Sequence, residues 1–359
     1  MSLELLAPTY LAALEDELRQ AIGTEFTQSA AALAARGQPA PTEANGAASE
    51  MLPEYYRMLT YHLGWTDGAA PQSAGKRIRP LLCLLCCSAA GGQWEQALPL
   101  AAAVELIHNF SLIHDDIEDN SALRRGRETV WVKWGQAQAI NAGDAMFTLA
   151  HLAPHRLLAR GVAPDLALAA LAELDYTCLA LTQGQYLDMS FEERSHVSVA
   201  EYLAMIEKKT AALIAAATAL GAAVAGAPPE RLAHYRDYGW NLGVAFQLQD
   251  DLLGIWGDPS VTGKSAASDL EKRKKSLPVV FGLERLPEFA AAYARPHQPG
   301  EPVDDLVEVL DELGARRYVE QQVEAATAQA RQSLALARAQ QPAGRALDEL
   351  TDQLLNRKM

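Results

Sequence analysis

The stretch from Leu106 to Thr129 reads LIHNFSLIHDDIEDNSALRRGRET and decides the fold. Its first half is apolar at helical spacing, which predicts a buried helix. That helix ends in a D-D-x-x-D array formed by Asp115, Asp116 and Asp119. Neighbouring carboxylates on such a helix lie about 6 Å apart and repel by roughly 0.7 kcal/mol per pair in water and about 3 kcal/mol in a partly desolvated cleft. A buried helix with this ending therefore predicts a cation bound over the array.

The acidic array favours a hard divalent cation. It offers carboxylate oxygens and no histidine or cysteine at zinc-ligand spacing, so we expect Mg²⁺, with Mn²⁺ as the alternative. Magnesium held by a few carboxylates usually completes its shell with water and phosphate oxygens, which indicates a phosphate ester as substrate. A D-D-x-x-D pattern alone is more often a solvated acidic face. The apolar run before it, which includes Val104, Leu106 and Ile107, is what favours the metal site.

The composition indicates an all-helical protein. The 359 residues are 49% hydrophobic and show no sustained period-two alternation. The net charge of -14 argues against nucleic acid as a partner, because a phosphate backbone would be repelled. Free buried thiols fit a cytoplasmic location, and three of the four cysteines lie in one apolar run: Cys83, Cys86 and Cys87, with Cys178 farther along.

The N-terminal part of the chain differs from the rest. MSLELLAPTY has neither the basic start nor the long apolar core of a signal peptide. Residues 3–35 have amphipathic helical spacing, and residues 36–50 are rich in proline, alanine and glycine, which is typical of a flexible linker. We therefore expect an N-terminal helical segment and linker over residues 1–50 and the main domain over residues 51–359. The longest uncharged run, Thr210 to Pro229, is too weakly hydrophobic for a transmembrane segment and predicts a core helix.

Basic motifs lie on both sides of the array. AGKRIRP, from Ala74 to Pro80, places three cations in four positions before an apolar helix, which suits anion capture near a helix start. Arg124 and Arg125 follow the array. A turn at Gly126 would fold their guanidinium groups back toward the carboxylates, where they can pair with phosphate oxygens.

A second acidic constellation, from Phe246 to Ser276, reads FQLQDDLLGIWGDPSVTGKSAASDLEKRKKS. Asp250 and Asp251 end an apolar helix, and Gln247 lies one turn before them. The loop that follows carries Lys264 and leads to a cluster of cations. This is the first arrangement in mirror form, and we expect the two arrays to face each other across an apolar cavity.

Taken together and in this order, five motifs strongly resemble the trans-isoprenyl diphosphate synthases, also called the polyprenyl synthetase family: AGKRIRP, HDDIEDNSALRRG, QGQYLD, KKT and FQLQDDLLGIWGD. The resemblance covers Gly75 to Lys275. It implies an all-α isoprenoid-synthase fold, in which antiparallel helices surround a deep central cavity, and a homodimer. It also implies an enzyme that condenses isopentenyl diphosphate with an allylic diphosphate.

The resemblance implies roles for individual residues. Three Mg²⁺ ions would hold the allylic diphosphate, two through Asp115, Asp116 and Asp119 and the third through Asp250. Other side chains would contact that diphosphate or act in catalysis: Arg124, Lys209, Thr210, Gln247, Lys264 and Lys274. A second set would hold isopentenyl diphosphate: Lys76, Arg79, His108 and Arg125. Ionisation would leave an allylic cation in an apolar cavity, where the double bond of isopentenyl diphosphate attacks it.

The sequence departs from the family pattern at three positions. Ala74 replaces a second glycine, and Glu128 stands where proline is common. Gly254 replaces the last aspartate of the second array. The missing carboxylate could come from Asp258 or Asp269.

Product length should depend on the side chains under the first array. Phe110 is the fifth residue before Asp115, and small Ser111 follows it, a combination that resembles the short-chain synthases making geranylgeranyl diphosphate. One helical turn is about 5.4 Å, roughly one isoprene unit of depth, so one bulky side chain can set the product. The alternative role for Phe110 is core packing.

Three other interpretations of the function stay open. The first is a farnesyl or longer-chain diphosphate synthase. The second is a class I terpene cyclase, which would not need Lys76, Arg79 and His108 for a second diphosphate. The third is a non-catalytic partner subunit of another prenyl synthase, which the departures at Gly254 and Glu128 keep open.

Overall fold

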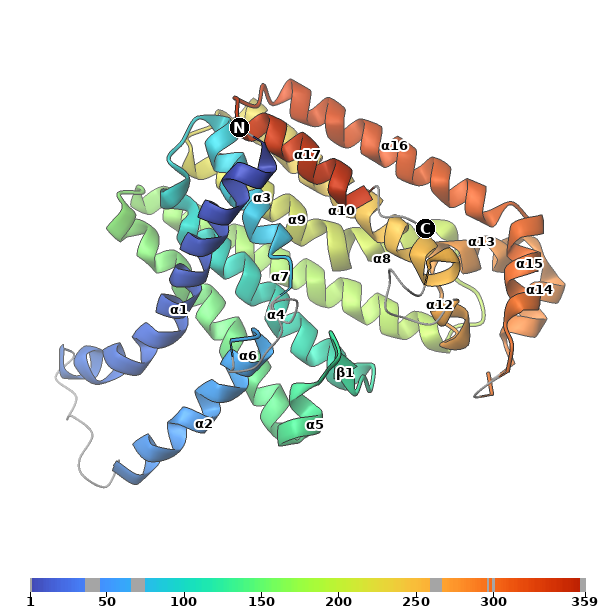
Figure 1. The fold of residues 1–359 in the computed structure, drawn as a ribbon, viewed down its shortest axis with the longest axis horizontal. Helices are drawn as coiled ribbons and strands as arrows, with labels where there is room; N and C mark the ends of the chain where they lie inside the picture. The colour runs from blue at the N-terminus through green and yellow to red at the C-terminus, as the bar shows by residue number, and fades with distance from the viewer. Residues whose placement is uncertain are drawn as a thin grey trace.

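The computed structural model describes residues 2–35, 46–65, 75–258, 267–295, 297–298 and 301–355. These residues are helical almost throughout, as predicted, and the fold is an all-α arrangement of packed helices (Figure 1). Within the described ranges the strands are two residues long, β1 (Leu123–Arg124) and β2 (Arg127–Glu128), and they pair antiparallel. The sequence predicted the turn at Gly126 but not the two strands beside it.

The helices follow one another with mostly short connections. In chain order they are α1 (Leu3–Ala35), α2 (Gly46–His62), α3 (Ile78–Ala90), α4 (Leu98–Glu118), α5 (Val130–Trp134), α6 (Gln136–Leu152), α7 (Pro164–Glu193), α8 (Val199–Ile206), α9 (Ala212–Val224), α10 (Pro229–Trp256), α12 (Ser268–Glu271), α13 (Leu277–Arg285), α14 (Pro287–Tyr293), α15 (Asp304–Glu312), α16 (Ala315–Leu336) and α17 (Ala343–Leu355). A π-helical turn, Glu207–Ala211, joins α8 to α9.

Helix α4 lies inside the bundle, in contact with α1, α3, α6 and α9. Leu106 and Ile107 on this helix are fully buried, as the apolar pattern predicted. The neighbouring helices α3 and α9 approach each other closely at Gly221. A β-carbon at this position would lie 2.0 Å from the carbonyl oxygen of Cys83, so glycine is needed there. Two of the helices that contact α4 are therefore packed backbone to backbone at this point.

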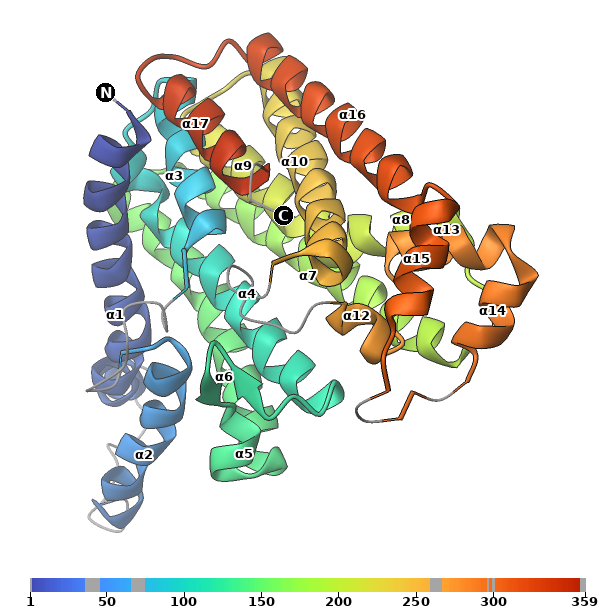
Figure 2. The same cartoon turned by 45° about the vertical axis from the view of Figure 1, so that its right-hand side comes forward.

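Helix α10 packs against α9 and α16. Its C-terminal half joins a second core through Leu248 and Leu252, which pack with Tyr202 of α8 and Val280 of α13. In Figure 2 both α4 and α10 run from the top of the molecule downward, so their C-terminal ends lie on the same side. The two acidic arrays lie at these ends.

The N-terminal helix is part of the main core. Leu14 and Leu18 of α1 are fully buried with α3 and α4 side chains, and the Tyr10 hydroxyl lies 2.7 Å from that of Ser88 on α3. Helix α2 begins at Gly46, inside the stretch that we predicted as linker, and residues 36–45 lie outside the described part of the chain. The division of the chain at residue 50 stays a prediction.

One helical stretch among the described residues, Trp94–Glu118, has the length and composition of a membrane span. Of its most apolar window, 78% is buried inside the fold. Its apolar side chains therefore already have protein neighbours, as in the core helix of a globular protein.

Candidate active site

The acidic end of α4 is paired with the hairpin that follows it. Arg125 and Gly126 both have positive φ angles, 52° and 74°, and this turn folds Arg124 back onto the helix. The Arg124 Nε donates to both carboxylate oxygens of Asp116, at 2.8 and 3.0 Å, and its Nη2 lies 2.8 Å from Oδ1. Asp116 is only 1% exposed, so this bidentate pair holds the hairpin against the array.

Two carboxylates of the array, Asp115 and Asp116, are costly to ionise. Burial raises the pKa of Asp115 to about 6, the charge of Lys209 opposes this, and the charges of Asp119 and Glu118 add to it. Burial also raises the pKa of Asp116, against the effect of Arg124. Carboxylates that are costly to ionise together are the donor set that a divalent cation would relieve, so these residues fit Mg²⁺. In the part of the chain that the structure describes, however, no three acidic, His or Cys side chains are already arranged around a common metal position.

The two aspartates at the end of α10 point to different surroundings. Asp251 is 1% exposed and accepts hydrogen bonds from the Tyr202 hydroxyl at 2.5 Å, the Leu277 N–H at 3.1 Å and Gln247 Nε2 at 3.2 Å. Asp250 is half-buried, and its charge acts on the Arg79 guanidinium, where it opposes the lowering of the pKa by burial. Asp250 is therefore the member of the pair that faces the other helices of the site.

Thr210 and Gln247 lie side by side between the π-helical turn and α10. The Thr210 hydroxyl donates to Gln247 Oε1 at 2.9 Å, while the Gln247 amide donates to Asp251. This chain of hydrogen bonds fixes the Gln247 side chain against the buried carboxylate. Neither residue is placed by local sequence alone, because 37 positions separate them.

Two lysines lie between the acidic walls. Lys209 Nζ donates to Asp188 at 2.5 Å, and its charge also acts on Asp115. Burial lowers the pKa of Lys274, but the pKa is raised overall by four carboxylates: Asp269, Asp188, Asp251 and Asp119. Asp119 of the first array and Asp251 of the second therefore both lie within electrostatic reach of Lys274. That the two arrays face each other across a cavity stays a prediction.

A cluster of basic side chains lies near the start of α3. Arg79 Nη1 and His108 Nε2 are 3.2 Å apart, and burial lowers the pKa of His108 well below its usual value, so the ring is neutral. Arg125 belongs to the same region: burial lowers its pKa, and the charge of Glu105 opposes this. Lys76 is exposed, and Lys264 lies outside the described residues.

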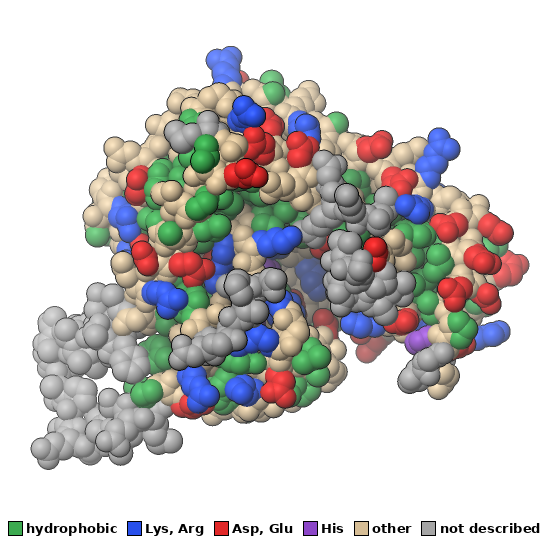
Figure 3. All heavy atoms as spheres, in the orientation of Figure 1, with side chains coloured by type: hydrophobic (Ala, Val, Ile, Leu, Met, Phe, Trp, Pro, Cys, Tyr) green, Lys and Arg blue, Asp and Glu red, His purple; other side chains and the backbone are tan. Residues whose placement is uncertain are grey.

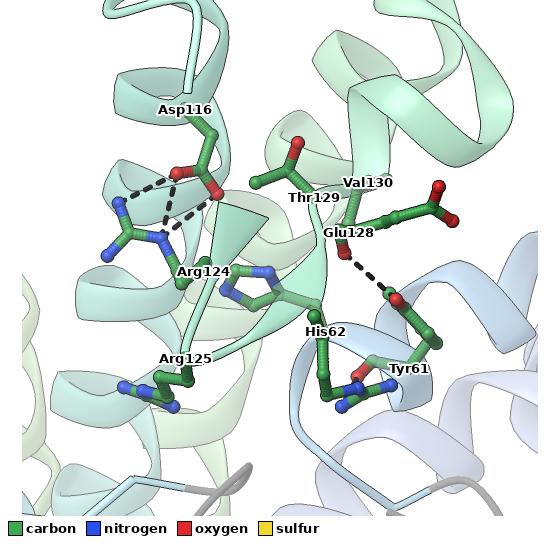
Figure 4. A pocket seen from close by; sticks show the side chains of 9 residues that line it. Tyr61, His62, Asp116, Arg124, Arg125, Glu128, Thr129 and Val130 are labelled. Atoms are coloured by element: carbon green, nitrogen blue, oxygen red, sulfur yellow. Dashed lines mark hydrogen bonds and ion pairs between the residues drawn. The ribbon is translucent and has the colours of Figure 1, made fainter. Parts of the chain in front are cut away.

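Figure 4 shows the pocket beside this hairpin, with the His62 ring at its centre in front of the β1–β2 strands. It is lined by Tyr61, His62, Asp116, Arg124, Arg125, Arg127, Glu128, Thr129 and Val130. Burial, together with the charges of four surrounding arginines, lowers the pKa of His62 to about 3. Sequence reasoning missed His62 and Tyr61; their position at the C-terminal end of α2, shortly before the basic motif, was the available signal.

Arg77, the middle cation of AGKRIRP, points into the protein and not toward the pocket. It is 5% exposed, and its guanidinium donates to Glu15 at 2.9 Å, to Glu105 at 2.7 Å and to the Leu63 carbonyl at 3.1 Å. These contacts join α1, α4 and the residue that follows α2 to the start of α3. The buried arginine thus fixes the backbone between Lys76 and Arg79, a role that the sequence did not indicate.

Phe110 lies one and a half turns before the array and is 8% exposed. Its ring makes edge contacts with Phe147 of α6 at 5.1 Å and with His114 at 5.8 Å between centroids. Ser111 donates to the His108 carbonyl at 2.9 Å. Phe147, which sequence reasoning did not single out, therefore completes an aromatic pair under the first array.

The space-filling view shows where charge gathers on one face of the molecule. That face is hollowed near its centre, and Lys and Arg side chains surround the opening (Figure 3). In a protein of net charge -14 this local concentration of cations is suited to an anionic ligand.

Comparison with known proteins supports the family resemblance that the motifs indicated. The sequence matches the profile of the polyprenyl synthetase family over residues 69–311. Over 237 residues it is 46% identical to a (2E,6E)-farnesyl diphosphate synthase of Mycobacterium bovis, covering 65% of each protein. Over 246 residues it is 45% identical to a geranylgeranyl diphosphate synthase of Mycobacterium tuberculosis, covering 67% of this chain and 69% of that protein. The chain is also similar to the crystal structure of a geranylgeranyl pyrophosphate synthetase from Pyrococcus horikoshii, with a TM-score of 0.83, 28% identity and 99% of both chains covered.

Proposed function

We propose a function from one premise: the chain belongs to the polyprenyl synthetase family. The protein is a prenyltransferase that condenses isopentenyl diphosphate with an allylic diphosphate to give a short-chain all-trans prenyl diphosphate. One observation carries this proposal. Asp119 at the end of α4 and Asp251 at the end of α10 act on the same lysine, Lys274, while a basic cluster that includes Arg79, His108 and Arg125 lies near the first array. Two anion sites next to each other are what a condensation of two diphosphates requires.

The allylic diphosphate binds between the two arrays. Asp115, Asp116, Asp119 and Asp250 would hold Mg²⁺, which supplies positive charge to the departing diphosphate. Lys209 and Lys274 lie between the acidic walls, where they bind the same leaving group. Arg124 is held on Asp116 in the unliganded protein, and its five N–H donors allow it to turn its other edge to the diphosphate. Thr210 and Gln247 position the α10 side of this site.

Isopentenyl diphosphate binds at the basic cluster. Arg79, His108 and Arg125 supply donors from α3, α4 and the hairpin, and Lys76 lies exposed at the start of α3. His62, in the adjoining pocket beside the hairpin, adds an uncharged imidazole within electrostatic reach of His108. Because His62 and His108 are neutral, they bind diphosphate oxygens through N–H donation and add no further charge to the cluster of arginines.

The growing chain extends into the apolar space beneath the first array. Phe110 and Phe147 make its floor, and their edge contact gives the floor two rings where the sequence indicated one. We favour geranylgeranyl diphosphate as the product. Farnesyl diphosphate is supported equally by the relatives, since a farnesyl and a geranylgeranyl synthase match this chain at 46% and 45% identity.

The active protein is a cytoplasmic homodimer. Four large apolar side chains are more than half exposed along the solvent-facing side of α7: Leu168, Tyr176, Leu179 and Tyr186. A row of this size on a long helix is typical of an interface between subunits. The four cysteines are buried and unpaired, which suits a reducing compartment. Sedimentation of the wild-type chain and of Leu179→Arg tests the dimer; a wild-type protein that sediments as a monomer at micromolar concentration contradicts it.

The test of the activity uses the purified full chain with Mg²⁺, labelled isopentenyl diphosphate and geranyl or farnesyl diphosphate, followed by sizing of the products. We expect a labelled C15 or C20 prenyl diphosphate that disappears when EDTA is added. A second incubation contains geranylgeranyl diphosphate alone. A cyclic hydrocarbon from that incubation would indicate a terpene cyclase, and no turnover with any allylic starter would indicate a non-catalytic subunit.

A further inference from the structure

The second acidic array lacks one carboxylate. The first array places Asp119 one turn after Asp115, whereas in the second array the residue one turn after Asp250 is Gly254. Gly254 is buried on α10. If α10 supplied all the acidic groups of its wall, that wall would be one group weaker than the wall on α4.

The space beside Gly254 is filled by a carboxylate from another helix. A β-carbon built on Gly254 would lie 2.3 Å from Oδ2, 2.6 Å from Cγ and 3.0 Å from Oδ1 of Asp269, and these are the three nearest atoms. Asp269 belongs to α12, which packs against α10. The carboxylate therefore occupies the position into which a side chain at residue 254 would extend.

Asp269 faces the same space as the rest of the site. Of the carboxylates that act on Lys274, Asp269 has the strongest effect, and Asp119 of the first array acts on the same lysine. The Lys274 N–H also donates to the Asp269 carbonyl at 2.9 Å, so the backbone turn keeps the two residues together. The other acidic candidate, Asp258, is exposed and contributes none of the three atoms nearest to the missing β-carbon.

We propose that Asp269 supplies from α12 the third carboxylate of the second array, and that Gly254 is present to leave room for it. The proposal rests on the proposed function and deepens it, since it names a further residue of the metal-binding wall. Asp250 and Asp269 then hold the cation on this side, with one ligand on the helix and one on the segment packed against it. Glycine is required at position 254 for space, and any side chain there would displace the carboxylate.

The test measures Mg²⁺ dependence without turnover. Inorganic pyrophosphate is titrated into the full-length protein by calorimetry at a series of Mg²⁺ concentrations, and the Mg²⁺ concentration for half-maximal binding is compared between variants. Asp269→Asn keeps the volume of the side chain and removes its charge, so we expect this concentration to rise by about 10- to 100-fold, the usual loss when a partner of a metal site is removed. Asp258→Asn is the matched control and should give the wild-type value.

A carboxylate exchange provides the second arm. Asp269→Gly should raise the Mg²⁺ midpoint as Asp269→Asn does, and Gly254→Asp alone should bind worse than wild type, because two carboxylates compete for one position. The double variant Gly254→Asp/Asp269→Gly returns a carboxylate to α10 and should recover at least about tenfold in Mg²⁺ midpoint over Asp269→Gly, a non-additive result expected of contacting residues. Circular dichroism and thermal unfolding of each variant confirm that it is folded.

Two results would overturn the proposal. One is an Asp269→Asn protein with the wild-type Mg²⁺ midpoint, and the other is a folded double variant that binds no better than Asp269→Gly. The condensation assay on the same wild-type preparation separates this failure from failure of the proposed function. A wild-type protein that condenses the two diphosphates while Asp269→Asn keeps its Mg²⁺ midpoint contradicts only the role of Asp269.

Discussion

Asp250 and Asp251 are adjacent in sequence and should respond to substitution in opposite ways. Asp251 accepts three hydrogen bonds inside the protein, from Tyr202, Leu277 and Gln247. Asp251→Ala leaves the Tyr202 hydroxyl and the Leu277 N–H buried without an acceptor, at a cost of about 1–3 kcal/mol each, so we expect a loss of about 4 kcal/mol. Asp250 is half-buried, and Asp250→Ala should change the free energy of unfolding by less than about 1 kcal/mol.

The difference is large enough to measure by thermal unfolding. At about 2.1 cal/mol/K per residue, a chain of 359 residues unfolds with an entropy of about 0.75 kcal/mol/K, so 4 kcal/mol lowers the Tm by about 5 °C. Circular dichroism at 222 nm in metal-free buffer gives the Tm, and calorimetry gives Mg²⁺-dependent binding of pyrophosphate. We expect Asp251→Ala to melt early and Asp250→Ala to melt normally but bind poorly. If the Tm of Asp250→Ala falls by about 5 °C and that of Asp251→Ala does not, the assignment of the buried and the half-buried member is wrong.

Three further predictions concern the first array and the basic motif. Because burial raises the pKa of Asp115 from 3.8 to about 6, its ionisation opposes folding above pH 6 and this cost vanishes as the pH falls toward 4; metal-free Asp115→Asn should therefore melt above wild type at pH 7.5, with a difference that shrinks by pH 4. A difference that does not vary with pH would contradict this origin. Phe110→Ala removes one ring of the floor and should lengthen the product on reversed-phase chromatography, whereas an active variant with the wild-type product would show that Phe110 only packs the core. Arg77→Met leaves Glu105 buried without its cation and should cost about 3–5 kcal/mol in urea unfolding, with a higher KM for isopentenyl diphosphate; adding Glu105→Leu should restore part of the stability, and no recovery would count against the buried pair.

The fold was predictable because helical periodicity and composition are local properties of the sequence. The burial of α4 up to Phe110 follows from its apolar spacing, and the return of Arg124 onto the array follows from the turn at Gly126. The family resemblance was predictable for the same reason, since its motifs are short and lie in fixed order. The start of α2 at Gly46 was not, because a glycine- and alanine-rich segment gives no clear signal for the first turn of a helix.

The sequence predicted which residues of the site lie on the same helix, but not which of them are buried or which residues of other helices they contact. Spacing cannot distinguish Asp250 from Asp251, because burial of the second depends on Tyr202 and Leu277, which lie 49 and 26 positions away. Similarly, the sequence left Asp258 and Asp269 as equal candidates for the missing carboxylate, and only the packing of α12 on α10 separates them. His62 was missed because it meets Asp116 and the hairpin residues only in the folded protein, and they lie more than 50 positions later in the sequence.

The ion pair between Glu15 and Arg77 joins the N-terminal helix α1 to the basic motif that we propose for isopentenyl diphosphate. The family profile begins at residue 69, so Glu15, Tyr61 and His62 all precede it. A shortened protein that starts there would retain the aspartates of both arrays, yet it would lose the partner of Arg77 on α1 and two residues that line the pocket beside the hairpin. Under the proposed function, residues that precede the family profile therefore contribute to the surroundings of the site for isopentenyl diphosphate.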